Sequence, residues 1–203
     1  MFEKNTIDKK LILYVFFSII FILLTNDYSS NSIFSEGSAA RSGEYYFSIA
    51  KNSPLFSNEI NHHHAQRFIF PFLIGYLANS FGIDLILIFK FFTYTNFIII
   101  FTLNLYLCKY LLLNFKNQLL IFGLIIFNPY IFRYFTLYPS MVVDLFFILS
   151  IYIFLVFLIN NNKLLLYTSI FFALSSRQTG IFFLIGIIFF FILLSFFKKK
   201  SVF

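Results

Sequence analysis

The chain has 203 residues, of which 60% are hydrophobic and 11% are charged. A soluble globular domain has about 45–50% apolar and about 25% charged residues, so this composition excludes an ordinary soluble fold and indicates a membrane protein. The single cysteine excludes a disulfide framework. We assign the net charge of +7 to lysines that set membrane topology, and we expect no nucleic acid as a partner.

Apolar segments follow one another along almost the whole chain and predict an all-α, polytopic membrane protein, with residues 1–203 forming a single transmembrane domain. A soluble helical core would need polar helix faces, which these segments lack. In chain order, the segments are Leu11–Leu24, Phe68–Phe81, Ile83–Leu107, Leu119–Phe135, Met141–Ile159, Leu164–Leu174 and Gly180–Phe197. Asn128 and Pro129 predict a kink in the fourth of them.

A polar loop rich in Ser and Asn, residues 26–66, separates the first two apolar segments. Within this loop the stretch GEYYFSIAKN places Tyr46, Ile49 and Ala50 on one face of a helix. We therefore expect a short helix near residues 43–52 that lies at the membrane surface, inside a long extracytoplasmic loop.

The distribution of positive charge predicts the topology. Cytoplasmic ends of membrane helices are enriched in Lys and Arg, and seven crossings would put the lysines of the two chain ends on opposite sides. Phe68–Phe81 is short and contains Pro71 and Gly75. We expect this segment to be re-entrant or interfacial, or to form one tilted helix with the next segment. About six crossings then remain, with both termini in the cytoplasm.

This topology separates two kinds of cation. The lysines of both chain ends fall inside with Lys109, Lys116 and Lys163. All four arginines of the chain fall outside: Arg41, Arg67, Arg133 and Arg177. Arginine suits bidentate contact with phosphate or carboxylate, where lysine is no substitute. The outer arginines are therefore candidates for binding an anion; alternatively, they pair with outer acids or snorkel to the membrane surface.

Asp144 is the acidic residue of greatest interest, because it lies inside an apolar segment. An ionisable side chain at membrane depth is costly and usually functional. It follows Tyr138, Pro139 and Ser140 and falls on the same predicted side as the arginines.

Four sequence features occur in an order that resembles the arrangement in one known class of membrane proteins. Asp27 follows the first apolar segment and opens the outer loop, in which YYFSIAKN resembles a surface-lying helix. AQRFIFPFLIGYLANSFG contains Arg67 and Pro71 in an Arg-x-x-x-Pro arrangement at the start of a segment. ALSSRQTGIFFL has small residues before Arg177, with Gln178 where an acid is usual. Together they resemble the N-terminal half, or a truncated member, of the GT-C superfamily of integral-membrane glycosyltransferases, which use polyprenyl-phosphate-linked sugars.

The resemblance implies that an acceptor hydroxyl on the outer face attacks the donor sugar and a polyprenyl phosphate leaves. It implies that Asp27 is the catalytic general base and that Asp144 lies near the acceptor or a metal. The candidates for binding the donor phosphate, by residue type and side, are Arg67, Arg133 and Arg177. The expected partners are the polyprenyl-phosphate-linked sugar, a lipid or glycan acceptor and membrane lipids. The cofactor is unknown, with a divalent cation as a candidate.

Three consecutive histidines, His62 to His64, stand just before Arg67. Consecutive residues cannot all face one metal from a helix, where ligands lie at i, i+3 or i+4, so we do not expect a zinc site here. Either the cluster is an interfacial polar cap without chemistry, or one histidine, for which we take His64, contacts a lipid phosphate or the acceptor sugar.

Other interpretations fit the same sequence. Asp27 lies in TNDYSS, which also favours a turn. A small six-helix transporter or substrate-binding membrane subunit would have this chain length and this even number of crossings, although its polar residues would gather near the bilayer midplane. A non-catalytic remnant or a piece of a longer enzyme fits as well, because GT-C enzymes generally carry further helices. In each case we expect an integral protein of a bacterial inner or plasma membrane.

Overall fold

The computed structural model describes residues 9–25, 41–55 and 67–200. Among these residues there are helices and short connections but no strand, so the predicted all-α fold is confirmed for the described part of the chain. In chain order the helices are α1 (Lys9–Thr25), α2 (Arg41–Asn52), α4 (Ile69–Phe81), α5 (Leu85–Tyr110), α6 (Phe115–Phe127), α7 (Phe132–Leu137), α8 (Val142–Asn160), α9 (Lys163–Ser176) and α10 (Gly180–Lys200), with a 3-10 turn, η1 (Pro139–Met141), before α8.

Local sequence explains where several of these helices begin and end. The side chains of Asn114 and Asn162 accept hydrogen bonds from backbone N–H groups in the first turns of α6 and α9. Gly82 ends α4 and Asn161 ends α8, both in the left-handed conformation that glycine and asparagine adopt most readily. The apolar segments are therefore separated by tight turns.

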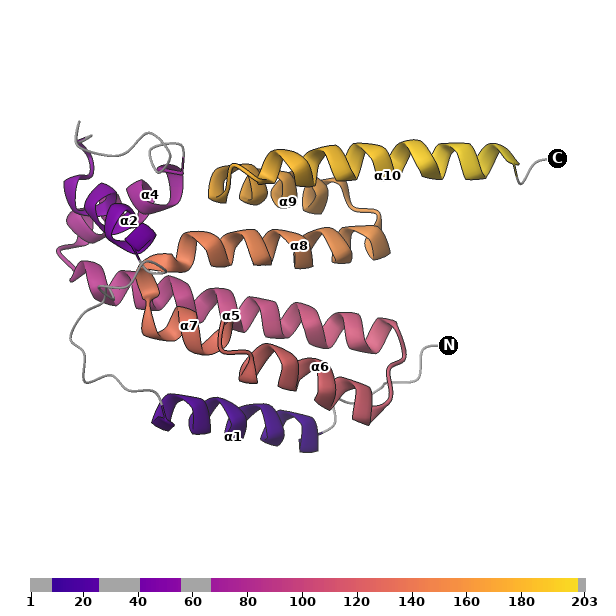
Figure 1. The fold of residues 1–203 in the computed structure, drawn as a ribbon, viewed down its shortest axis with the longest axis horizontal. Coiled ribbons are helices and arrows are strands. Elements are labelled where there is room, and N and C mark those ends of the chain that lie inside the picture. Colours follow the sequence, from indigo (N-terminus) through magenta and orange to yellow (C-terminus); the bar gives the residue numbers. More distant parts are fainter. Residues whose placement is uncertain (1–8, 26–40, 56–66, 201–203) are drawn as a thin grey trace.

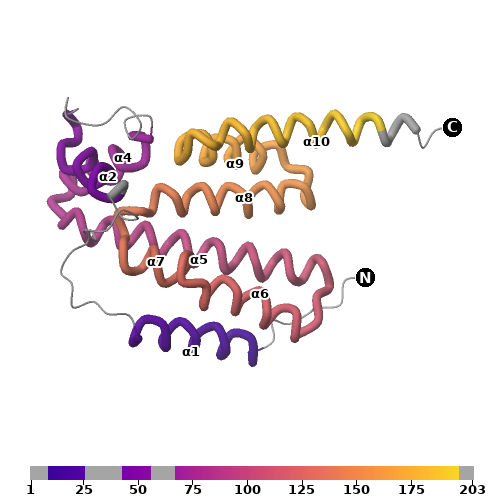
Figure 2. The backbone as a smooth tube through the Cα atoms, viewed as in Figure 1, coloured from indigo at the N-terminus to yellow at the C-terminus, as the bar shows by residue number. Residues whose placement is uncertain are grey.

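The long helices form a layered bundle (Figure 1). Contacts join α1 to α6, α5 to α8, α8 to α9 and α9 to α10. Helices α5 and α6, α8 and α9, and α9 and α10 form pairs that run in opposite directions. Helices α2 and α4 lie together at one end of this bundle. Helix α1 begins at the opposite end, and α10 runs towards it (Figure 2).

The cations sort along the bundle. We call the end with α2 and α4 the arginine end, because it carries the start of α2 at Arg41, Arg67 before α4, Arg133 in α7 and Arg177 between α9 and α10. The opposite end, the lysine end, carries the lysines at the start of α1, α6 and α9 and at the end of α5 and α10. Arginines and most lysines thus lie at opposite ends of the bundle, as the predicted topology requires. Lys51 and Lys90 lie on helices near the arginine end.

Three stretches are long and apolar enough to cross a membrane: Leu85–Tyr110, Phe115–Leu137 and Pro139–Asn160. The chain is therefore a helical membrane protein. Ile69–Phe81, Lys163–Ser176 and Gly180–Phe196 are shorter apolar helices. The number of crossings stays a prediction.

The second of the three stretches is broken, where the sequence predicts only a kink. Helix α6 ends at Phe127 and α7 begins at Phe132, and the side chain of Asn128 accepts a hydrogen bond from the backbone N–H of Tyr130 in the connection. Pro129 has no N–H to donate to the preceding turn, so the helix is interrupted before the chain continues as α7 to the arginine end.

The helix expected near residues 43–52 is present as α2, and its apolar face packs on protein. Tyr46, Ile49 and Ala50 are buried, and α2 contacts α4 and η1. A Cβ at Gly75 of α4 would collide with the backbone carbonyl of Ala50, so the two helices approach at a distance only glycine allows. That α2 lies at the membrane surface remains a prediction.

We predict that the arginine end faces the outside of the membrane. In a Cys108→Ser background, which removes the chain's cysteine, Leu55→Cys and Lys116→Cys place exposed thiols at the arginine end and the lysine end, respectively. A membrane-impermeant maleimide should label Leu55→Cys in intact cells and Lys116→Cys only after permeabilisation. Labelling in the reverse order, or of both positions in intact cells, would refute this topology.

Candidate functional site

Asp144 lies in the first turn of α8 at the arginine end and is 7% exposed. A carboxylate in this turn is favoured by the positive end of the helix dipole. The 3-10 turn η1, which starts at Pro139, brings the chain into α8.

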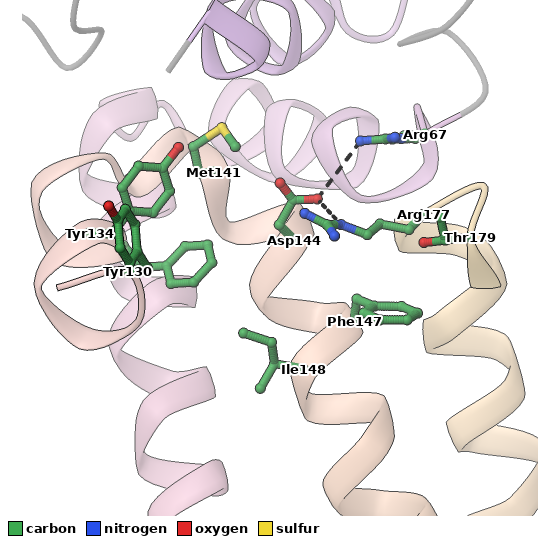
Figure 3. Close-up of a pocket in the computed structure, with 10 residues that line it drawn as sticks. Arg67, Tyr130, Tyr134, Met141, Asp144, Phe147, Ile148, Arg177 and Thr179 are labelled. Atoms are coloured by element: carbon green, nitrogen blue, oxygen red, sulfur yellow. Dashed lines mark hydrogen bonds and ion pairs between the residues drawn. The ribbon is translucent and has the colours of Figure 1, made fainter. Parts of the chain in front are cut away.

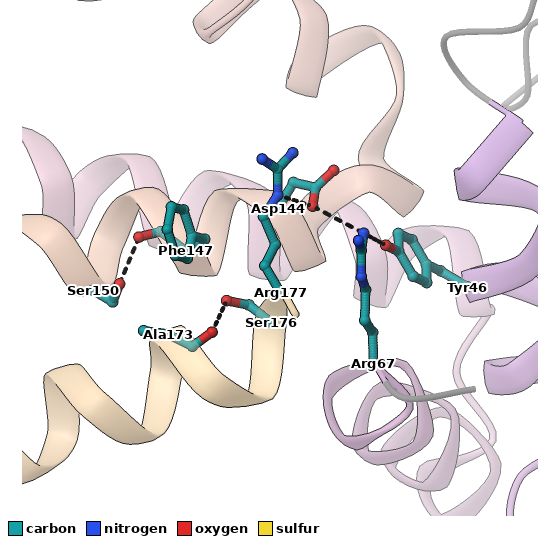
Figure 4. Close-up of polar contacts among 8 residues, drawn as sticks. All are labelled: Tyr46, Arg67, Asp144, Phe147, Ser150, Ala173, Ser176 and Arg177. Carbon is teal, nitrogen blue, oxygen red and sulfur yellow. Dashed lines mark hydrogen bonds and ion pairs between the residues drawn. The ribbon is translucent and has the colours of Figure 1, made fainter. Parts of the chain in front are cut away.

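Two arginines converge on this carboxylate. Nε of Arg177 donates a hydrogen bond to Oδ1 of Asp144 over 2.7 Å, and Nη1 of Arg67 lies 3.8 Å from the same oxygen. Nη1 of Arg67 also donates to the phenolic oxygen of Tyr46 over 2.8 Å (Figure 4). Side chains from α2, from the connection into α4, from the start of α8 and from the α9–α10 connection therefore meet at one point.

Small residues place Arg177 there. Arg177 follows the last residue of α9 in an extended conformation, and Ser175 and Ser176 before it are buried. A Cβ at Gly180 would collide with the backbone of Ala173, so the turn from α9 into α10 closes tightly. The ALSSRQTG stretch therefore acts as a compact corner that directs the guanidinium towards α8.

The cluster has an excess of positive charge, since two guanidinium groups face one carboxylate. The hydrogen bond to Asp144 raises the pKa of Arg177 above its ordinary value, although burial acts in the opposite direction. Burial, and then the nearby Asp144 carboxylate, raise the pKa of Tyr46, so its phenol stays neutral. Nε of Arg67 is buried without a hydrogen-bond partner among the described residues. A buried, charged donor that lacks an acceptor is costly, which favours an anionic ligand here.

A cavity of about 570 Å³ opens beside the cluster. Figure 3 shows Arg67, Arg177 and Thr179 on one side of Asp144, and Tyr130 and Tyr134 across from them. The remaining lining residues are apolar: Phe135, Met141, Phe147 and Ile148. The guanidinium carbon of Arg177 lies 5.8 Å from the centre of the Phe147 ring, a cation–π distance. The cavity is thus cationic on one wall, aromatic on the other and apolar towards the bundle.

The structure brings together three of the predicted site residues, Arg67, Arg177 and Asp144. Arg133 is not among the residues that line the cavity; its Nη2 donates a hydrogen bond to the carbonyl of Thr25, the last residue of α1, over 2.9 Å. Asp27 and His64 lie outside the described residues.

Sequence reasoning missed the role of Tyr46, because the face that carries it was assigned to the membrane surface. It also missed Tyr130 and Tyr134, because Tyr130 lies in the connection between α6 and α7 and no helical spacing relates it to Tyr134. Among the described residues, no three His, Cys, Asp or Glu side chains group as metal ligands.

Comparison with known proteins gives no match: no family model, no curated protein and no solved structure is similar to this chain at a significant level. The function is therefore inferred from the site itself.

Proposed function

We propose that this protein binds a polyprenyl-phosphate-linked sugar at the arginine end and transfers the sugar to an acceptor hydroxyl, as a GT-C-type glycosyltransferase. The observation that carries the proposal is the convergence of Arg67 and Arg177 on Asp144 beside a cavity of about 570 Å³ in a helical membrane bundle. A lipid phosphate carries the negative charge that would balance the two guanidinium groups and one carboxylate of this cluster. Its lipid chain fits the apolar side of the cavity.

Arg177 is well placed to hold the phosphate. Asp144 engages its Nε, which leaves the two terminal nitrogens of the planar fork for a ligand, and the Arg177 side chain is 40% exposed. Asp144 is thus a positioning residue, because it orients the guanidinium. Guanidinium groups that are held in place before the reaction stabilise the charge that develops on a departing phosphate.

The reaction is a substitution at the anomeric carbon. The acceptor oxygen forms the new glycosidic bond, the bond from the anomeric carbon to the phosphate oxygen breaks, and its electron pair stays on the polyprenyl phosphate. The hydroxyl proton goes to a carboxylate. Asp144 is engaged by two arginines, so the proposal keeps Asp27 as the base; Asp27 follows Thr25 by two residues.

The transporter alternative is favoured less. Helix α5 has two buried asparagines, Asn96 and Asn104, each with one amide atom that has no partner among the described residues. The described ionic cluster lies at the arginine end and not beside these asparagines, whereas transporters bind their substrates near the midplane.

We predict that Arg177→Lys weakens polyprenyl phosphate binding by about tenfold, because lysine keeps the charge but loses the fork. Purified protein in detergent would be titrated with polyprenyl phosphate and with the uncharged polyprenol. Arg133→Lys is the matched change outside the cavity lining and should alter the affinity by less than about twofold. Equal binding of phosphate and alcohol by the wild-type chain would refute the phosphate site. Unchanged affinity in Arg177→Lys would leave the arginine a structural role only.

A further inference from the structure

A second cavity, of about 530 Å³, lies between the end of α8 and the later turns of α10. We call it the lysine-end cavity. Its walls are apolar and mostly aromatic, formed by Phe157 and Leu158 of α8 and by Phe190, Phe191 and Leu194 of α10. None of these residues lines the cavity at the arginine end, so the two cavities are separate sites. The volume is within the range of about 300–1,000 Å³ that is typical of small-molecule pockets.

Polar residues line only one end of this cavity. Asn161 follows the last residue of α8 and is exposed, and Ser195 lies on α10 after the apolar lining residues of that helix. Helices α8 and α10 both run towards the lysine end (Figure 1). The polar end of the cavity therefore faces the lysine end of the bundle, and the apolar walls lie deeper in the membrane. A ligand that fits has a polar head and an apolar chain.

The depth of the cavity identifies the leaflet that supplies this ligand. On α10 the lining runs from Phe190 to Ser195, five residues, which is about 7.5 Å at about 1.5 Å per residue. The hydrocarbon core of one leaflet is about 15 Å thick, half of about 30 Å. The cavity thus lies within the leaflet at the lysine end. An acyl chain of that leaflet would supply contacts to the apolar walls that an empty space cannot.

The charge of the lysine end favours an anionic head group. The described acids are Glu44 in α2, Asp84 before α5 and Asp144 at the start of α8, and all three belong to the arginine end. The described lysines of the opposite end therefore have no acid beside them. Lys163 is the lysine that follows Asn161 most closely, two residues later, and it is exposed without an ion pair among the described residues. Basic pockets between membrane helices are suited to anionic lipid head groups.

We propose that the lysine-end cavity binds one anionic phospholipid of the adjoining leaflet, with an acyl chain against the aromatic walls and the head group beside Asn161 and Lys163. Under the predicted topology this is the cytoplasmic leaflet. The proposal does not depend on the proposed function, because it uses no residue of the ionic cluster. Helix α10 packs mainly on α9 and reaches α8 through ring contacts, such as Phe157 with Phe191 at 6.0 Å between ring centres. The lipid would fill the remaining space and hold α10 against α8.

Thermal unfolding of the purified chain in neutral detergent tests the proposal. We expect phosphatidylglycerol to raise the unfolding midpoint in a saturable way, by about 3–6 °C at ten times its dissociation constant, and phosphatidylcholine to raise it by less than about 1 °C. Lys163→Gln should weaken the phosphatidylglycerol effect about fivefold in concentration. Lys116→Gln removes the same charge at the start of α6, away from the cavity, and should change it by less than about twofold.

Fluorescence quenching locates the lipid, because the chain contains no tryptophan and one introduced indole reports on one position. Leu194→Trp places the indole in the cavity lining. Leu120→Trp is the matched control: Leu120 is exposed on α6, one turn after Lys116, so it has a lysine nearby but does not line this cavity. In vesicles, brominated phosphatidylglycerol should quench Leu194→Trp at about one fifth of the mole fraction that brominated phosphatidylcholine requires. The two lipids should quench Leu120→Trp equally.

Three results would overturn the proposal. The first is equal quenching of Leu194→Trp by the two brominated lipids, together with no shift of the wild-type unfolding midpoint by phosphatidylglycerol. The second is loss of the phosphatidylglycerol effect when Lys198, Lys199 and Lys200 are replaced by glutamine but not in Lys163→Gln, which would assign the effect to attraction of the chain end to the membrane surface. The third is disulfide cross-linking between copies of Leu194→Cys, in a Cys108→Ser background, that phosphatidylglycerol does not suppress, which would identify a second copy as the occupant.

Discussion

Asp27→Asn is expected to lower the rate of sugar transfer by about 10²- to 10⁴-fold while membrane insertion is unchanged, because an amide cannot accept the proton of the acceptor hydroxyl. The measurement is transfer of radiolabelled sugar from a panel of polyprenyl-phosphate donors to endogenous lipid or glycan acceptors in membranes that contain the chain. The donor panel is needed because the sugar is not specified by any residue of the site.

Asp84→Asn is the matched control for this prediction. Asp84 is an exposed acid that precedes α5, and its side chain makes no capping hydrogen bond there. The rate should change by less than about twofold. Full activity in Asp27→Asn would exclude Asp27 as the base. If the wild-type chain transfers no sugar from any donor, the enzyme proposal fails, and a binding subunit or a non-catalytic remnant takes its place.

Asp144→Ala is expected to lower the free energy of unfolding by about 3 kcal/mol, because it leaves two guanidinium groups without their carboxylate and the Arg67 side chain is only 14% exposed. The loss should appear as a lower midpoint of thermal unfolding in detergent, followed by circular dichroism. Asp84→Ala removes an exposed carboxylate at the same end and should cost less than about 0.5 kcal/mol.

The double variant Asp144→Asn with Arg177→Gln measures the coupling between these two residues. Arg67 lacks its carboxylate both in Asp144→Asn and in the double variant, so that loss cancels in the comparison. We expect the double variant to be more stable than the sum of the two single changes predicts. Additive effects would contradict a coupled pair. If Asp144→Ala destabilises the protein while Arg177→Lys leaves polyprenyl phosphate binding unchanged, the cluster holds α8 to the α9–α10 corner and does not bind the lipid.

Much of the helical framework is predictable from the run of apolar residues alone. The predicted segments Leu164–Leu174 and Gly180–Phe197 correspond to α9 and α10, because an asparagine cap begins α9 and a tight corner separates α9 from α10. The helix is interrupted after Phe127, where the sequence predicts only a kink. A proline predicts the loss of a hydrogen bond, but whether the helix bends or stops depends on the contacts of α7 with α5 and η1.

The site could be predicted only in part. Residue type and topology place Arg67, Arg177 and Asp144 on one side, but they do not pair them. The pairing depends on the α8–α9 hairpin, which returns the chain to the arginine end 33 residues after Asp144. The approach of Tyr46 to Arg67 depends on how α2 packs on α4, and an amphipathic pattern does not distinguish a lipid surface from a neighbouring helix.

The contact between Gly75 and the carbonyl of Ala50 has an evolutionary consequence. Arg67 is carried on the residue pair that leads into α4, so its position depends on how closely α4 approaches α2. A side chain at position 75 would separate the helices and shift the arginine without altering any charged group. Selection at this position therefore acts on the absence of a side chain. Descendants that lose the glycine should keep the Arg67 guanidinium in its place only if a compensating substitution in α2 restores the packing.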